Sequence, residues 1–253
     1  LAGAILNSYE ESNTFNGFMI IFSLGMVANF GSIYYLNRQY EPENTTDDEI
    51  IEIDISNTNM DSRLKRFITY DSLSEFSFHV SGPLMMVYWL RDLKFDYIEL
   101  AILINVSQVL GLFSMRYWGK RIDNNGSYST IRFTSFCIGI FPMFWVGIYY
   151  LPNELILAGS IIIASLASLM FSGRALALDN RLYEHMKNKK MIKVTSKRFF
   201  FRGLSIFIGG LIGGLITRNE SSFSNYVEID TVIHAVMGFS TVLRLGVWSY
   251  FLI

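Results

Sequence analysis

Residues 155–171 read LILAGSIIIASLASLMF, with no charged side chain and no continuous polar face. Residues 136–151, FCIGIFPMFWVGIYYL, have the same character. A helix that is apolar all round lies either in a large protein core or in a bilayer. The hydrocarbon core of a bilayer is about 30 Å thick, and a helix needs about 20 apolar residues to cross it. Both stretches therefore predict transmembrane helices.

Long apolar segments of this kind occupy most of the chain. The seven that we recognise are residues 14–36, 76–92, 97–118, 130–151, 155–178, 199–217 and 231–253. Only 17% of the 253 residues are charged, whereas a soluble domain carries about 25%. We therefore predict an all-α membrane protein, a polytopic bundle of seven transmembrane helices. The partner predicted from composition is the surrounding lipid bilayer.

Lysine and arginine are concentrated in alternate connections. The linker 37–75, the stretch 116–132 and the connection 174–202 together hold 17 of the 21 cations. Because such connections face the cytoplasm in membrane proteins, we expect residues 1–13 outside and the C-terminus in the cytoplasm. The expected location is the cell membrane, either an inner or a plasma membrane.

Other compositional features exclude several function classes. The net charge of -1 gives no reason to expect a nucleic-acid partner. The basic run KNKKMIKVTSKR, residues 187–198, lies between two predicted spans, where contact with anionic lipid explains it better. The single cysteine, Cys137, forms no internal disulfide and is interpreted as a packed apolar residue. No histidine has the spacing of a metal site or a paired nucleophile, so we expect no enzyme, no metal and no cofactor.

The chain is expected to have three parts. Residues 1–36 are interpreted as the end of one span and a complete second span. Residues 37–75 form an acidic cytoplasmic linker, in which 64–76 are predicted as a short amphipathic helix at the membrane surface. Residues 76–253 form a six-helix bundle.

LAGAIL (1–6) and LIGGLI (211–216) are each followed by a polar stretch and lie six spans apart, which is the repeat expected of a transporter with two six-span halves.

GKRIDNNG, residues 119–126, resembles the G-x-x-x-D-x-x-G core of the cytoplasmic loop motif of the major facilitator superfamily. The stretches 81–93, 117–120 and 208–214 are also similar to bacterial and archaeal members. In that family the motif joins spans 2 and 3, and a fainter copy joins spans 8 and 9. The resemblance implies a C-terminal half, from the end of span 5 through span 12, of a secondary transporter that works by alternating access. Its partners would be the missing N-terminal half and a small solute.

The motif predicts a gate latch. Gly119 and Gly126 permit a tight turn, and Asp123 is expected to accept charge-assisted hydrogen bonds from Arg121, Arg132 or a helix N-terminus. In the family this arrangement latches two helices in one of the two access states. Ser127 and Tyr128 stand where the family has basic residues. The alternative is an ordinary turn with a solvated Asp123.

Polar residues within the predicted spans are candidates for a substrate or proton pathway, because they are costly in a bilayer. The four candidates are His79, Tyr88, Asn105 and Gln108. The alternatives are an interfacial histidine and helix–helix hydrogen bonds by the two amides. Arg244 is expected to pair within the bundle or to reach toward the interface. No carboxylate falls at the centre of a predicted span, and no group of cations indicates a dedicated anion site.

Glycines in the segment 199–217 predict close helix packing. The two overlapping G-x-x-x-G spacings consist of Gly209 with Gly213 and Gly210 with Gly214.

Two other functions stay open beside transport. One is a non-transporting scaffold or inactive half-protein, and the other, with less support, is a heptahelical receptor. As a fragment, the chain alone is expected to transport nothing. Fold does not determine the substrate.

Overall fold

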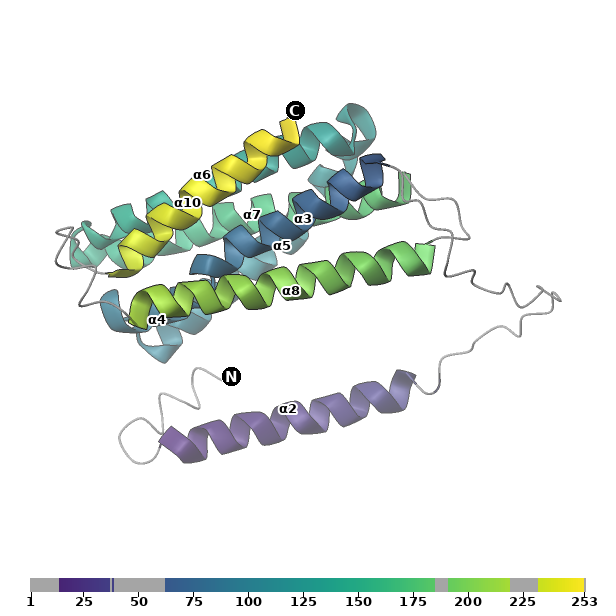
Figure 1. Cartoon of the computed structure of the whole chain (residues 1–253). Helices are drawn as coiled ribbons and strands as arrows, with labels where there is room; N and C mark the ends of the chain where they lie inside the picture. Colours follow the sequence, from purple (N-terminus) through teal and green to yellow (C-terminus); the bar gives the residue numbers. More distant parts are fainter. Residues whose placement is uncertain (1–13, 37, 39–61, 185–190, 219–231, 253) are drawn as a thin grey trace. The chain divides into compact units, whose positions relative to one another are not determined.

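The fold is described from a computed structural model (Figure 1), in which the described residues are 14–36, 38, 62–184, 191–218 and 232–252. The chain divides into two units, residues 1–61 and residues 62–253. In the first unit the described element is helix α2 (Thr14–Leu36). The expected end of a preceding span, at residues 1–13, and most of the acidic linker lie outside the described residues.

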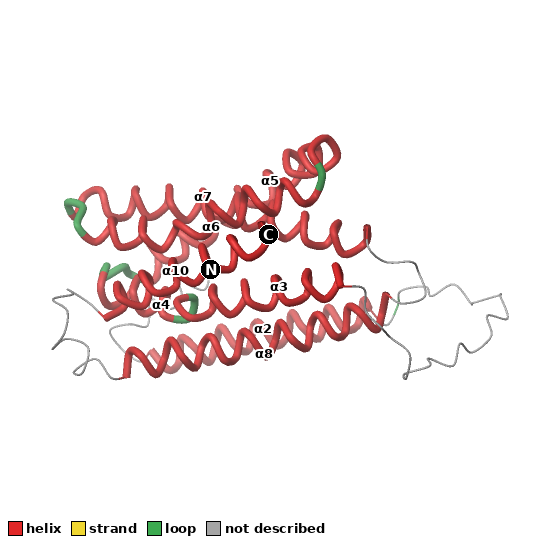
Figure 2. The backbone as a smooth tube through the Cα atoms, turned by 45° about the horizontal axis from the view of Figure 1, so that its top comes forward, coloured by secondary structure: helices red, strands yellow, loops and turns green. Residues whose placement is uncertain are grey.

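The second unit is a bundle of helices. Its elements are α3 (Ser62–Ser81), α4 (Leu84–Val87), the π-helical turn η1 (Tyr88–Asp92), α5 (Tyr97–Asn125), α6 (Ser127–Tyr149), α7 (Asn153–Glu184), α8 (Met191–Arg218) and α10 (Val232–Leu252). The described connections between them are short (Figure 2). Asp96 and Glu99 cap the start of α5 reciprocally, and Gly126, with a φ of 81°, joins α5 to α6.

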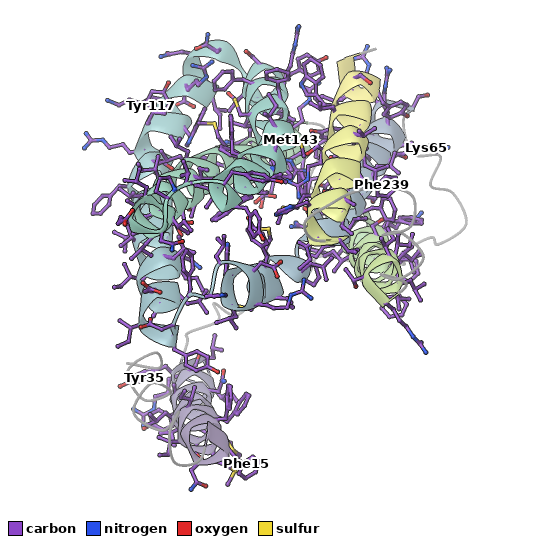
Figure 3. The ribbon with its side chains drawn as sticks, turned by 90° about the vertical axis from the view of Figure 1, so that its left-hand side faces the viewer. Phe15, Tyr35, Lys65, Tyr117, Met143 and Phe239 are labelled. Carbon is purple, nitrogen blue, oxygen red and sulfur yellow. The ribbon has the colours of Figure 1, made fainter. Side chains whose placement is uncertain are left out.

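The prediction of an all-α membrane bundle is confirmed. Within the described ranges, α2, α5, α6, α7, α8 and α10 are long and apolar enough to cross a bilayer. Large apolar side chains lie on the outside of the second unit, as at Tyr117 and Phe239 (Figure 3). Phe113 is 79% exposed. Because so much exposed apolar surface would be unstable in water, it is the surface that lipid covers.

The span expected at residues 76–92 differs in the structure. It is the second half of a broken helical run, 62–92, that begins with the polar helix α3 and continues through α4 and η1. The break falls at Gly82 and Pro83, because proline has no N–H to donate within a helix. Residues 64–76, expected at the membrane surface, instead pack within the bundle, where Leu64, Phe67 and Ile68 are buried. The bundle therefore begins at Ser62.

Helices α3 and α8 run parallel and in close contact. A Cβ added to Gly209 would meet the backbone oxygen of Phe76, and one added to Gly213 would meet that of Val80. A step of four residues along α8, from Gly209 to Gly213, corresponds to a step of four in the same direction along α3, from Phe76 to Val80. The two helices are therefore parallel. Gly214 faces elsewhere, since a Cβ there would have no neighbour within 4 Å, and a Cβ on Gly210 would touch only the Pro83 ring, beyond the end of α3. Only one of the two G-x-x-x-G pairs thus lies at this interface.

The remaining helices complete the bundle. Helix α10 runs antiparallel to α3, because Tyr70 stacks on Phe251 near one end of the pair and Ser81 donates a hydrogen bond to Ser240 further along. Helices α5 and α7 pack together where Trp118 lies against Gly173 and donates to the Leu169 carbonyl at 2.8 Å. Helix α6 packs between α7 and α10.

We predict that Gly213→Ala weakens the α3–α8 contact. The new methyl group would collide with the Val80 carbonyl, and overpacking of this kind costs about 1–3 kcal/mol. Thermal unfolding in detergent should show a lower midpoint for this variant. Gly214→Ala is the matched control, because its methyl group meets open space, and its midpoint should stay equal or rise. Equal loss in both variants would contradict the assigned interface.

Candidate functional site

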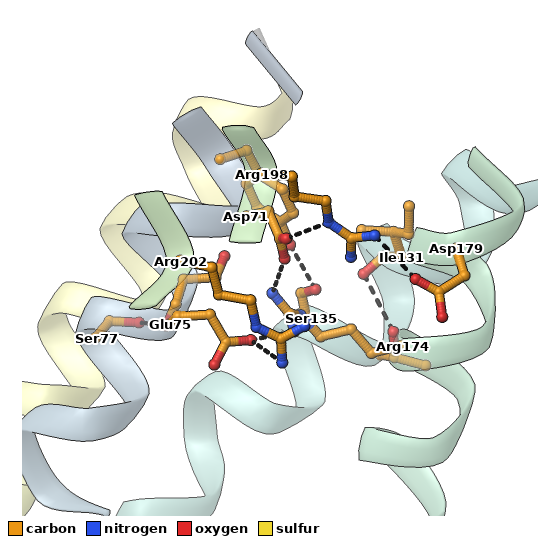
Figure 4. A network of polar contacts seen from close by, with 12 residues as sticks. Asp71, Glu75, Ser77, Ile131, Ser135, Arg174, Asp179, Arg198 and Arg202 are labelled. Carbon is orange, nitrogen blue, oxygen red and sulfur yellow. Dashed lines mark hydrogen bonds and ion pairs between the residues drawn. The ribbon is translucent and has the colours of Figure 1, made fainter. Parts of the chain in front are cut away.

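Helix α3 places two carboxylates inside the bundle. Asp71 and Glu75 are four residues apart and therefore lie on one helix face, with side chains that are 0% and 6% exposed. Arg198 and Arg202 have the same spacing on α8, the parallel neighbour. We call the following set the ion cluster: Asp71, Glu75, Arg174, Asp179, Arg198 and Arg202 (Figure 4).

The tightest contacts of the ion cluster are made by Arg198. Its Nε donates to Asp71 Oδ2 at 2.7 Å, and its Nη1 donates to Asp179 Oδ1 at 2.9 Å. Helices α3, α7 and α8 are joined through this one guanidinium (Figure 4). Planar arginine suits this role because its donors have a fixed fork geometry.

Arg174 of α7 stands between the two carboxylates. Its Nη2 lies 3.6 Å from Asp71 Oδ1, and its Nη1 lies 3.5 Å from Glu75 Oε1. Glu75 Oε1 is also 3.1 Å from Nη2 of Arg202. The contacts of Arg174 are longer than those of Arg198, and its Nε and Nη2 have no hydrogen-bond partner among the described residues. Its position is therefore held by charge and packing more than by hydrogen bonds.

The two carboxylates were missed because residues 62–75 were assigned to the linker. A usable signal was present in the sequence. Leu64, Phe67, Ile68, Asp71 and Glu75 follow helical spacing, and all five are buried. When a helix face begins with apolar residues and continues with acidic ones, the acidic side chains are expected to be buried as well. They then form buried ion pairs if other helices supply cations. Asp71 and Glu75 precede the predicted span 76–92, so the expectation of no carboxylate at the centre of a predicted span did not cover them.

Arg244 of α10 lies further along α3, on the side of Ser77 and Ser81. Its guanidinium donates to four neutral oxygens, at distances of 3.0 to 3.5 Å. They are Ser240 Oγ, Ser81 Oγ and the carbonyl oxygens of Ile138 and Phe78. Among the described residues no carboxylate forms an ion pair with it. Arg244 thus ties α10 to α3 and α6 while its charge stays uncompensated by a nearby anion.

A central cavity of about 620 Å³ lies beside the ion cluster. Residues from α3, α4, η1, α5, α6, α7, α8 and α10 line it. Its charged lining residues are Glu75, Arg174, Arg202 and Arg244. Its aromatic walls are formed by Phe78, Trp89, Phe141, Trp145 and Phe171. The cavity has the size of a small-molecule site, which ranges from about 300 to 1,000 Å³.

The structure separates the four predicted pathway residues. His79 and Gln108 line the central cavity, and His79 Nδ1 lies 2.9 Å from the Glu75 carbonyl oxygen. Tyr88 is buried away from the cavity and donates to the Trp145 carbonyl at 2.8 Å. The side-chain nitrogen of Asn105 donates to the Ala101 carbonyl in its own helix at 2.7 Å. Only two of the four residues are therefore placed where a solute could meet them.

The predicted latch is not formed by Asp123 within the described residues. Asp123 is exposed and has no hydrogen bond or ion pair there, while Arg121 contacts Tyr117 and lies 5.0 Å from the centre of the Phe133 ring. The side chain of Arg132 is exposed, and a Cβ on Gly119 would meet nothing within 4 Å.

A different residue pair ties this end of the bundle together. Ser127 donates to Glu184 at 2.7 Å, and Arg181 contacts the same carboxylate at 2.8 Å, which joins the start of α6 to the end of α7. The one conformational requirement of the motif that the structure shows is the positive φ of Gly126.

Comparison of the chain with protein-family models, with curated proteins and with solved structures found no match. The residues of the site are therefore the basis for a functional proposal. In the described part of the chain, no three histidine, cysteine, aspartate or glutamate side chains come together as metal ligands. The cavity brings together charged groups, hydrogen-bonding groups and aromatic surface.

We predict that Asp71→Asn lowers the free energy of unfolding by about 3–5 kcal/mol, because it removes the fully buried carboxylate that Arg198 and Arg174 share. Asp179→Asn removes the other partner of Arg198 and is the matched control. The Asp179 side chain is 60% exposed, so its loss should cost about 0.2–1 kcal/mol. Unfolding by SDS titration in mixed micelles measures both. Equal effects would mean that burial does not determine the strength of these pairs.

Proposed function

We propose that this chain belongs to a secondary transporter of small solutes that works by alternating access. The observation that carries the proposal is the half-open central cavity with charged walls between the helices of an apolar bundle. Charged groups buried among membrane-spanning helices destabilise a membrane protein unless they are paired, and in membranes they mark pathways for solutes or ions. A purely structural bundle would be more stable with apolar residues of similar size at these positions.

The ion cluster supports a two-state mechanism. Its members join α3, α7 and α8, while the glycine contact holds α3 against α8 further along. Arg174 lies within 3.6 Å of both Asp71 and Glu75, so it can keep one carboxylate while it releases the other. Such an exchange gives packed helices two discrete arrangements, which alternating access requires. The break at Gly82 and Pro83 gives the run 62–92 a place to bend.

The proposed orientation follows from the cations. Helices α3, α6 and α8 begin at one end of the second unit, where α5, α7 and α10 end. Most described lysines and arginines belong to this end, which we propose to be cytoplasmic. The C-terminus would then be cytoplasmic too, and the protein would lie in the cell membrane.

We predict that Gln108→Ala reduces solute uptake by about threefold to tenfold, the effect of losing one hydrogen bond to the solute. Asn105→Ala, one helical turn away, should keep uptake unchanged, because its amide bonds its own helix outside the cavity. Membrane vesicles from cells that express the whole gene are incubated with a mixture of small metabolites. Their contents are then compared by mass spectrometry with those of vesicles lacking the protein. Absence of any accumulated solute would contradict transport and favour a non-transporting scaffold.

A further inference from the structure

The lining of the central cavity has more cations than anions. Arg174, Arg202 and Arg244 contribute three positive charges, against the single carboxylate of Glu75. Arg174 and Arg202 share Glu75, and Arg174 also meets Asp71 behind the wall. Arg244 is the lining cation that has no carboxylate partner among the described residues. A buried charge that lacks a counterion destabilises the structure around it. The cavity therefore favours an occupant that carries negative charge.

Arg174 lines the cavity, and its protein neighbours leave part of its hydrogen-bonding capacity unused. Its side chain is only 5% exposed, and its Nε and Nη2 have no hydrogen-bond partner among the described residues. Its two carboxylate neighbours are 3.5 and 3.6 Å away, too long for strong charge-assisted hydrogen bonds. A guanidinium that lines a cavity with part of its hydrogen-bonding capacity unused supplies one half of an anion site.

Arg244 supplies the other half. Each of its acceptors in the described structure is a neutral hydroxyl or carbonyl oxygen. Both guanidinium groups lie near one aromatic ring, because the central carbon of Arg174 is 4.7 Å and that of Arg244 is 5.0 Å from the centre of the Phe78 ring. Both cations thus lie close to the same ring, and both line the cavity.

The rest of the lining describes the body of the ligand. Phe78, Trp89, Phe141, Trp145 and Phe171 surround the space beside the arginines. Flat apolar surfaces bind an aromatic or aliphatic group, and they offer nothing to a small inorganic anion. We propose that the central cavity binds an organic carboxylate, whose anionic head lies between Arg174 and Arg244 and whose apolar body lies against the aromatic walls. For its biological meaning this inference rests on the proposed transport function, and it names the class of substrate.

The test is binding, measured on the full-length protein in detergent at constant ionic strength by isothermal titration calorimetry. The probe is benzoate, and benzamide is the control of the same shape without charge. Benzoate should bind at least about tenfold more tightly, because hydrogen bonds to a charged group contribute more than neutral ones. Equal affinity for benzamide, or no heat with benzoate, overturns the proposal. Inorganic phosphate that binds as tightly as benzoate overturns the organic part of it.

Variants locate the site. Arg244→Gln should weaken benzoate binding at least about tenfold and leave the weak binding of benzamide unchanged. Arg116→Gln is the matched control, because Arg116 is exposed on α5 and does not line the cavity. If Arg244→Gln does not fold, Arg174→Gln tests the same head group, and the comparison of benzoate with benzamide needs no variant. Benzoate binding unaffected by either substitution overturns the assigned residues.

The outcomes separate this inference from the proposed function. Benzoate binding without any solute flux in vesicles leaves the carboxylate site standing and removes the transport proposal. Flux of neutral solutes alone, without benzoate binding, leaves transport standing and removes the carboxylate site.

Discussion

The ion pair between Asp71 and Arg198 is the constraint on which the second unit depends. In an apolar bundle neither charge is stable alone, so helix α3 must lie where the cations of α7 and α8 can meet its carboxylates. This pairing explains why a helix too polar to be counted among the long apolar ones still packs inside the bundle. The geometry at Arg198, with bonds of 2.7 and 2.9 Å, makes the pairing specific.

Once α3 is held there, its other contacts follow. Gly209 and Gly213 allow the backbone of α8 to approach Phe76 and Val80. This close van der Waals contact stabilises the helix pair, because in lipid there is no hydrophobic driving force between helices. On another side, Ser240 donates to the Ser77 carbonyl at 2.7 Å and fixes α10. Helix α3 thus carries a polar seam that begins at Asp71 and continues past Ser77 to Ser81.

The central cavity lies along this seam, which links stability to the proposed function. The groups that hold the helices together are also the groups that a solute would meet, as with Glu75 and Arg174. A ligand that competed for Arg174 would change the balance between its two carboxylates, and under the proposed mechanism that change would affect α3 and α7 together. The coupling needs no long path, because binding and helix packing share the same side chains.

The sequence alone determined the membrane class, the positions of most helices and the turn at Gly126. It did so through the long apolar segments, the placement of lysine and arginine, and the glycine at the turn. These features are local or compositional, because a bilayer selects them segment by segment. Tertiary structure alone decided the site. Asp71 meets a cation 127 residues away, and Arg174 and Arg244 share the ring of Phe78 only after three helices pack. The motif at 119–126 gave a turn but no latch by Asp123 in the described structure, since a motif specifies a local backbone and not the partner across the bundle.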